Sequence, residues 1–189
     1  LKSGDKIVGN TDFCNYPQES QNKTKVGGYF SPNLEKIISL QPDIVIMLDS
    51  SKKLSKKINK LGIKTELLKL TTLDDIKKSI KIIGELLQKE KEANKILAQV
   101  EEKLNNTQDI RKNQKILMVS GHYLSLEKRV FVVGQNLYLD DSITMSGNKN
   151  GFFSKAKGQP VLNMENIIAT NSDIVILLSP YRQKKNLTN

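Results

Sequence analysis

Two short, continuous apolar runs stand out in the pattern of hydrophobic and polar positions along the chain. One covers residues 44–48 and the other 174–178, and each comes directly after an aspartate. Uninterrupted apolar runs of this length are typical of parallel strands that are buried on both faces. The pattern therefore predicts a buried parallel strand in each half of the chain.

The first half alternates strand and helix signals. The pattern predicts strands at 6–9, 44–48 and 63–70 and helices at 31–41 and 51–61. Ser31 is suited to the N-cap of the first helix, Pro32 to its first position, and Gly62 to the C-cap of the second. This βαβαβ order predicts a parallel sheet with helices on both faces, in which ligands bind beyond the carboxyl ends of the strands.

A sustained helical signal follows, from Thr72 to about Asn106, where apolar residues recur at intervals of three and four. Thr72 and Asp75 have the spacing of a capping box. Polar residues at 88–92 predict a break into two helices. The second helix, from Glu90, is expected to be about 25 Å long, which is enough to bridge two lobes.

The remainder of the chain predicts a second α/β unit. Strands are expected at 115–120, 131–133 and 174–178 and helices at 137–145 and 163–169. The last helix and strand repeat a pattern of the first half: a helix with an early glutamate, Glu35 or Glu165, then a loop aspartate, then a buried strand. First-turn glutamates usually interact only with the helix dipole. Their repetition indicates a duplicated unit and a shared role.

Composition limits the classes of function. The formal net charge is +10, with 30 lysines and arginines, so binding to nucleic acid is an alternative to consider. Only three of these residues are arginines, however, and arginine is the preferred partner of phosphates and base edges. No apolar stretch reaches the ~20 residues that cross a bilayer. Cys14 is the single cysteine, which excludes an internal disulfide or a cysteine-based zinc cluster within these residues.

Catalytic motifs are absent from the sequence. It contains no GxGxxG, P-loop, GxSxG or HExxH pattern, and any histidine-dependent mechanism would have to use His122. His122 and the neighbouring Tyr123 come after the strand at 115–120, at an end where ligands bind. Two interpretations of the His122 side chain remain open, a solvated loop imidazole and a ligand contact that could coordinate iron.

Aromatic residues gather in the loops of the first half, although aromatics make up only 5% of the chain. They are Phe13, Tyr16, Tyr29 and Phe30. Aromatics on loops at strand ends can form an apolar floor for a planar or bulky ligand, and a tyrosinate such as that of Tyr29 suits ferric iron. The alternative is that Phe13 and Phe30 only anchor their loops to the core.

The motifs of the first half, in order, resemble the helical-backbone substrate-binding proteins of iron-siderophore, haem and cobalamin ABC importers. These motifs lie at 4–9, 11–17, 25–28, 31–35 and 40–45, and the segments 133–147 and 163–176 are similar to the second lobe of the same family. The resemblance covers nearly the whole chain.

The resemblance implies an α/β fold of two Rossmann-like lobes joined by a rigid backbone helix. The corresponding ranges are 1–72 for a partial N-terminal lobe, 73–108 for the helical segment and 109–189 for a partial C-terminal lobe. It implies that no cofactor is bound covalently. The transported ligand would be an iron-siderophore, haem or cobalamin, clamped between the lobes and delivered to an ABC permease and ATPase complex.

The resemblance also implies roles for individual residues. Phe13 and Tyr29 match pocket aromatics, and Glu35 and Glu165 match the glutamates that dock onto the permease. Gln159 stands where the cobalamin binder has an aromatic residue. Family members begin with a further strand and helix and continue past the last strand, so we expect this chain to be a truncated or fragmentary binding protein.

The resemblance also implies where the protein works, and two alternative functions remain open. Family members work in the periplasm or on a lipid anchor outside the cell, with membrane contact only through the permease or the anchor. No charged start followed by an apolar segment is present, so we expect any export signal to have been removed or to lie outside the given residues. The alternatives are a metal-dependent enzyme on a similar α/β scaffold, such as a nitrogenase-like subunit, and a basic nucleic-acid-binding module.

Overall fold

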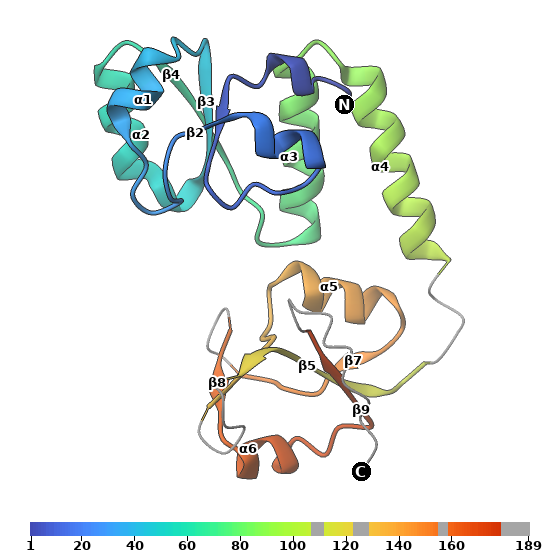
Figure 1. The fold of residues 1–189 in the computed structure, drawn as a ribbon. Helices are drawn as coiled ribbons and strands as arrows, with labels where there is room; N and C mark the ends of the chain where they lie inside the picture. Colours follow the sequence, from blue (N-terminus) through green and yellow to red (C-terminus); the bar gives the residue numbers. More distant parts are fainter. Residues whose placement is uncertain (107–111, 123–128, 155–158, 179–189) are drawn as a thin grey trace. The chain divides into compact units, whose positions relative to one another are not determined.

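The computed structural model describes residues 1–106, 112–122, 129–154 and 159–178 of the 189-residue chain (Figure 1). The chain divides into two compact units. Unit 1 comprises Leu1–Leu70 with Lys78–Asn94, and unit 2 comprises Thr71–Lys77 with the chain from Lys95 onward. The helical segment is therefore shared between the units.

Unit 1 contains two separate pairs of parallel strands. β1 (Gly9–Asn10) pairs with β2 (Thr24–Lys25), and β3 (Ile44–Leu48) pairs with β4 (Lys64–Leu68) over its full length. The prediction of one continuous parallel sheet in this half was wrong. The strands were correctly predicted as parallel, but no described strand joins the two pairs.

The strand predicted at 6–9 was also largely wrong. Gly4–Lys6 forms a 3₁₀ turn, and only Gly9 and Asn10 reach β2. Ile7 and Val8 are exposed on the surface. A strand requires a hydrogen-bonded neighbour, and among the described residues these two have no neighbouring strand.

Helix α1 (Leu34–Ser39) begins later than its sequence pattern suggests. Asn33 is its N-cap, because the Asn33 side chain accepts a hydrogen bond from the backbone N–H of Lys36 at 2.9 Å. The predicted cap, Ser31, was wrong, since Pro32 forms a bridge with Gly27 and lies outside the helix. Helix α2 (Lys52–Lys60) ends as predicted before Gly62, which has a φ of +83°.

The core of unit 1 lies between these two helices and β3 (Figure 1). Its buried residues are Val26, Ile37 and Ile58, surrounded by the partly buried side chains of Leu34, Leu40, Val45, Met47, Leu54 and Ile63. Ile58 is fully buried. Burial of such a side chain contributes about 1.5–3 kcal/mol, so this cluster holds α1 and α2 against one face of β3.

Helices α3 (Leu73–Leu86) and α4 (Glu90–Asn105) form the helical segment. The capping box is confirmed: Thr72 N–H donates to the Asp75 carboxylate and Asp75 N–H to the Thr72 hydroxyl, both at 3.1 Å. The predicted break falls at Gln88, whose φ is +54°. A Cβ at position 84 would lie 2.6 Å from the Ala93 side chain, so Gly84 permits the close approach of the two helices.

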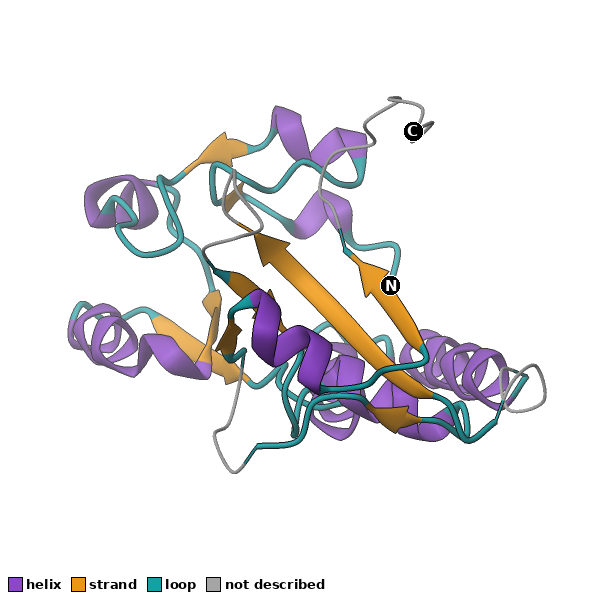
Figure 2. Cartoon of the chain, turned by 90° about the horizontal axis from the view of Figure 1, so that it is seen from below, coloured by secondary structure: helices purple, strands orange, loops and turns teal. Residues whose placement is uncertain are grey.

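Unit 2 is built around β5 (Lys115–His122), which extends two residues beyond its predicted end. β9 (Ile174–Leu177) runs parallel beside it (Figure 2). β7 (Lys149–Asn150) pairs in parallel with its beginning, β6 (Val130–Val132) pairs antiparallel with its end, and β8 (Val161–Leu162) pairs with β6. The result is a mixed five-stranded sheet.

Helices α5 (Tyr138–Met145) and α6 (Met164–Ala169) complete unit 2, close to their predicted positions. The core cluster consists of Leu117, Val119, Val130, Val132 and Leu162, with Phe152 and Ile167 packed against it. Alternate residues of β5 and β6 thus supply one apolar face. Among the described helices, none combines the length and hydrophobicity needed to cross a bilayer.

Candidate functional site

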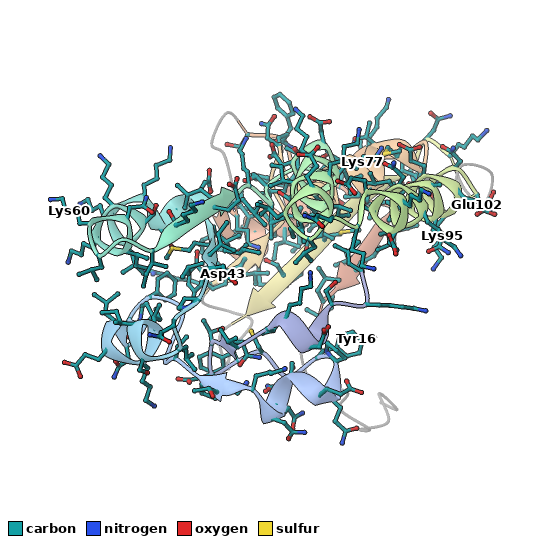
Figure 3. All side chains as sticks on the ribbon, turned by 90° about the horizontal axis from the view of Figure 1, so that it is seen from above. Tyr16, Asp43, Lys60, Lys77, Lys95 and Glu102 are labelled. Carbon is teal, nitrogen blue, oxygen red and sulfur yellow. The ribbon has the colours of Figure 1, made fainter. Side chains whose placement is uncertain are left out.

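The loop between β1 and β2 carries two of the predicted aromatic residues. Phe13 is 81% exposed and Tyr16 is 93% exposed. The Tyr16 ring projects away from the chain in Figure 3. Neither ring anchors the loop to the core, so the interpretation of Phe13 as only a packing anchor was wrong.

Hydrogen bonds to a lysine hold this loop together. The Lys25 ammonium lies 2.9 Å from Asn10 Oδ1 and 3.0 Å from the Cys14 carbonyl oxygen. It also lies 3.4 and 3.3 Å from the carbonyl oxygens of Thr11 and Ser20. The beginning, middle and end of the loop therefore contact one cation.

Tyr29 occupies the position expected of a site residue at a strand end. Its hydroxyl shares a 2.7 Å hydrogen bond with Ser50, which lies in the 3₁₀ turn that follows β3. The Phe30 ring packs edge-on against the Tyr29 ring at a centroid distance of 4.7 Å, and Phe30 is 94% exposed. The structure thus places one half-buried and one exposed aromatic at the carboxyl end of β3.

The second-half candidates are only partly described. His122 is the last residue of β5 and pairs with Val130 across the antiparallel ladder. Tyr123 lies outside the described residues. Gln159 is exposed in the segment before β8.

Both repeated glutamates are exposed at the first turn of their helices, Glu35 on α1 in unit 1 and Glu165 on α6 in unit 2. The prediction that Glu35 and Glu165 are exposed, one in each unit, is confirmed. Neither carboxylate is needed for the cap, because Asn33 and Asn163 fill that position.

A further aromatic loop in unit 2 escaped the sequence analysis. Phe153 is 83% exposed in the segment after β7. Gln135 shapes this segment, since its side chain donates to the Phe152 carbonyl and accepts from Ser154 N–H at 2.9 Å. An open hollow of about 420 Å³ lies beside it, lined by Gly151, Phe152, Phe153, Leu162, Asn166, Ala169 and Thr170.

The omission has a physical cause. β7 is only two residues long, so no hydrophobic periodicity marks it as a strand. The consecutive pair of phenylalanines was the one available signal. In the part of the chain that the structure describes, no group of three or more histidine, cysteine or acidic side chains is arranged to hold a metal ion.

Comparison with known proteins gives a consistent result. A family model described as "Periplasmic binding protein" matches residues 1–188. The chain is 27% identical to the uncharacterized ABC transporter substrate-binding lipoprotein YvrC of Bacillus subtilis, over 97% of this chain and 60% of that protein. It is 26% identical to the vitamin B12-binding protein of Vibrio campbellii, over 91% of this chain and 62% of that protein.

Solved structures of similar proteins share the fold. The periplasmic heme-binding protein HutB of Vibrio cholerae superposes with a TM-score of 0.78 at 22% identity, covering 93% of this chain and 68% of that one. The vitamin B12-binding protein BtuF of Vibrio cholerae gives 0.76 at 19% identity, covering 92% and 68%. The chain spans about three fifths of the length of the curated relatives named above.

Proposed function

This chain belongs to the periplasmic binding protein family, and we propose that it captures a metal chelate for an ABC importer. The relatives are named as a transporter lipoprotein and a vitamin B12-binding protein, and similar structures are those of haem and vitamin B12 binders. An iron-siderophore, haem or corrinoid is therefore the proposed class of ligand. Relatives of these kinds are binding proteins of transporters, which favours this reading over an enzyme.

The exposed aromatic side chains of unit 1 are the observation that carries the proposal. Phe13, Tyr16 and Phe30 each leave most of a large apolar surface in water. Burying such a ring against a planar or macrocyclic ligand removes that surface from water, at about 25 cal/mol per Å². Tyr29 adds a ring fixed by Ser50 at a strand end, where its phenol oxygen could also contact a ferric ion.

Titration with three probes tests this proposal. The apo protein is mixed with hemin, cyanocobalamin and ferrichrome, and binding is followed through their visible absorption. Phe13→Ala and Tyr29→Ala should each weaken binding of the preferred probe by about 1–3 kcal/mol, the scale for a lost aromatic contact. Tyr29→Phe retains the ring and separates the contribution of the hydroxyl.

Leu61→Ala is the matched control, since Leu61 is an exposed apolar residue of the same unit, at the end of α2. It should bind like the wild type. If none of the probes binds, or if both aromatic variants bind as well as the wild type, the aromatic-floor proposal is wrong.

We further propose that Glu35 and Glu165 dock the protein onto its permease. Each is exposed, each opens a helix of the repeated segment, and each unit carries one. Exposed charges of this kind mainly steer association and set register, and their effect is screened over roughly 8 Å at physiological ionic strength. The full-length protein is expected to act at the outer face of the membrane, in the periplasm or on a lipid anchor.

Stimulation of ATP hydrolysis by the cognate importer in lipid nanodiscs tests the docking role. The double variant Glu35→Ala/Glu165→Ala should need a higher concentration to stimulate hydrolysis, with less dependence on salt, while its ligand affinity stays unchanged. Glu85→Ala/Glu102→Ala provides a control, because these glutamates are also exposed, one in each unit, but lie outside the repeated segment. Equal behaviour of the two double variants would rule the docking role out.

A further inference from the structure

The loop between β1 and β2 lacks an apolar anchor of its own. None of the residues from Thr11 to Lys23 is buried, and the 3₁₀ turn at Gln18–Asn22 contributes no buried side chain. Loops without buried contacts sample several conformations unless polar contacts restrain them. What gives this loop one shape must therefore be its hydrogen bonds.

The Lys25 ammonium is the centre of those bonds. Four oxygens surround it at 2.9–3.4 Å: Asn10 Oδ1 and the carbonyl oxygens of Thr11, Cys14 and Ser20. An ammonium has three N–H groups, so two of the oxygens share a hydrogen. None of these four acceptors is a carboxylate, so each of them offers the ammonium a neutral dipole.

Two neighbouring bonds tie the same acceptors to each other. The Asn10 side-chain amide donates to the Ser20 carbonyl at 2.8 Å, and the Ser20 hydroxyl donates to the Cys14 carbonyl at 2.8 Å. Removing the ammonium leaves these oxygens with fewer donors and leaves their dipoles pointing at one another. Hydrogen bonds that involve a charged group are about twice as strong as neutral ones, so Lys25 dominates the network.

We propose that Lys25 is a positioning residue for ligand capture: an internal cation that orders the loop 11–22 and thereby holds the exposed rings of Phe13 and Tyr16 in a single arrangement. This inference rests on the proposed function for its effect on binding. A preorganised loop loses less conformational entropy when the ligand arrives, which strengthens binding without any direct contact between Lys25 and the ligand.

Hydrogen exchange of the ligand-free protein tests the ordering role independently of any ligand. Lys25→Met has a side chain of similar length without charge or N–H donors. In this variant amide exchange of residues 11–22 should accelerate about 10- to 100-fold, the scale of a lost charge-assisted hydrogen bond, while exchange in α2, β3 and β4 stays as in the wild type. Lys23→Met, two positions away in the same loop, is the matched control and should exchange like the wild type.

Probe binding then tests the consequence for capture. With whichever of hemin, cyanocobalamin and ferrichrome binds the wild type, Lys25→Met should raise the Kd roughly tenfold, and Lys25→Arg, which keeps a cation with N–H donors, should restore it to within about threefold. Should Lys25→Met not fold, Lys25→Gln replaces it, since the neutral amide still fits the site.

Unchanged loop exchange in the neutral variant would overturn the proposal, as would faster exchange with an unchanged Kd. Equal Kd values for Lys25→Met and Lys25→Arg would also overturn it, because the charge would then contribute nothing. If no probe binds even the wild type, the proposed function fails, yet the exchange experiment still decides whether Lys25 orders the loop.

Discussion

The two copies of the repeated segment have the same local structure and different surroundings. Each residue of the copy in unit 2 lies 130 positions after its counterpart in unit 1. Asn33 and Asn163 cap their helices by the same bond, to the backbone N–H three residues later, at 2.9 and 2.8 Å. Gln41 and Asn171 both adopt the left-handed conformation, with φ of +46° and +45°.

The two copies of the repeated segment differ in how their side chains and strands pack. Ile37 is buried under α2 in unit 1, whereas its counterpart Ile167 is only half-buried, and Ile168 is more exposed than Ile38. β9 pairs along β5, the central strand of a mixed sheet, whereas β3 has a single described partner, β4. Similar local sequence therefore produces the same helix cap and the same turn in both copies. The burial of matched side chains depends instead on which other segments of each unit pack against them.

The largest difference between the copies should appear at the matched isoleucines. Ile37→Ala removes a buried side chain and should reduce the free energy of unfolding by about 2–4 kcal/mol, whereas Ile167→Ala should cost roughly half as much because part of its surface is already in water. Urea unfolding measures the loss, and hydrogen exchange in each unit assigns it. Equal losses would show that the two sites are packed alike.

The caps should behave identically in the two copies. Asn33→Ala and Asn163→Ala each remove the same bond and should each cost about 1 kcal/mol, while Asn33→Asp and Asn163→Asp should cost little. The measurement is again urea unfolding with exchange in α1 and α6. A cost confined to one copy would contradict the equivalence of the two helix starts.

The two loop aspartates, Asp43 and Asp173, should contribute differently to the stability of their units. The Asp173 carboxylate accepts a hydrogen bond from Lys115 N–H at 2.7 Å and so joins β9 to the start of β5. Asp173→Ala should cost roughly 1 kcal/mol. Asp43, whose carboxylate has no hydrogen-bond partner among the described residues, should be replaceable by alanine at little cost. A larger effect at Asp43 than at Asp173 would overturn this assignment.

The smallest effects concern the left-handed residues that end the two helices. Gln41→Gly should stabilise unit 1 by about 0.5–1 kcal/mol, because glycine adopts positive φ without steric strain. Asn171→Gly should change unit 2 by only a few tenths, since asparagine already tolerates this conformation. Gln41→Ala retains the strain and is the control. Stabilisation by alanine as well would show that strain is not the cause.

Much of the molecule could be predicted from local patterns. The capping box at Thr72 and the end of α2 near Gly62 follow from contacts between residues a few positions apart. The strand at Ile44–Leu48 is marked by its uninterrupted apolar run, although its partner β4 lies 20 positions later. The resemblance to binding proteins of ABC importers was confirmed by the family match and the shared fold, because the order and spacing of several motifs carry more information than any one motif.

The sequence by itself therefore determined the α-helices and the longer strands, the repeat and the family. Only the tertiary structure decided which strand edges pair and which of two equivalent isoleucines is buried. It also decided that Lys25 meets oxygens up to 15 positions away and that Tyr29 bonds to Ser50, 21 positions away. Such contacts depend on how distant segments fold against each other, and no periodicity along the chain encodes them.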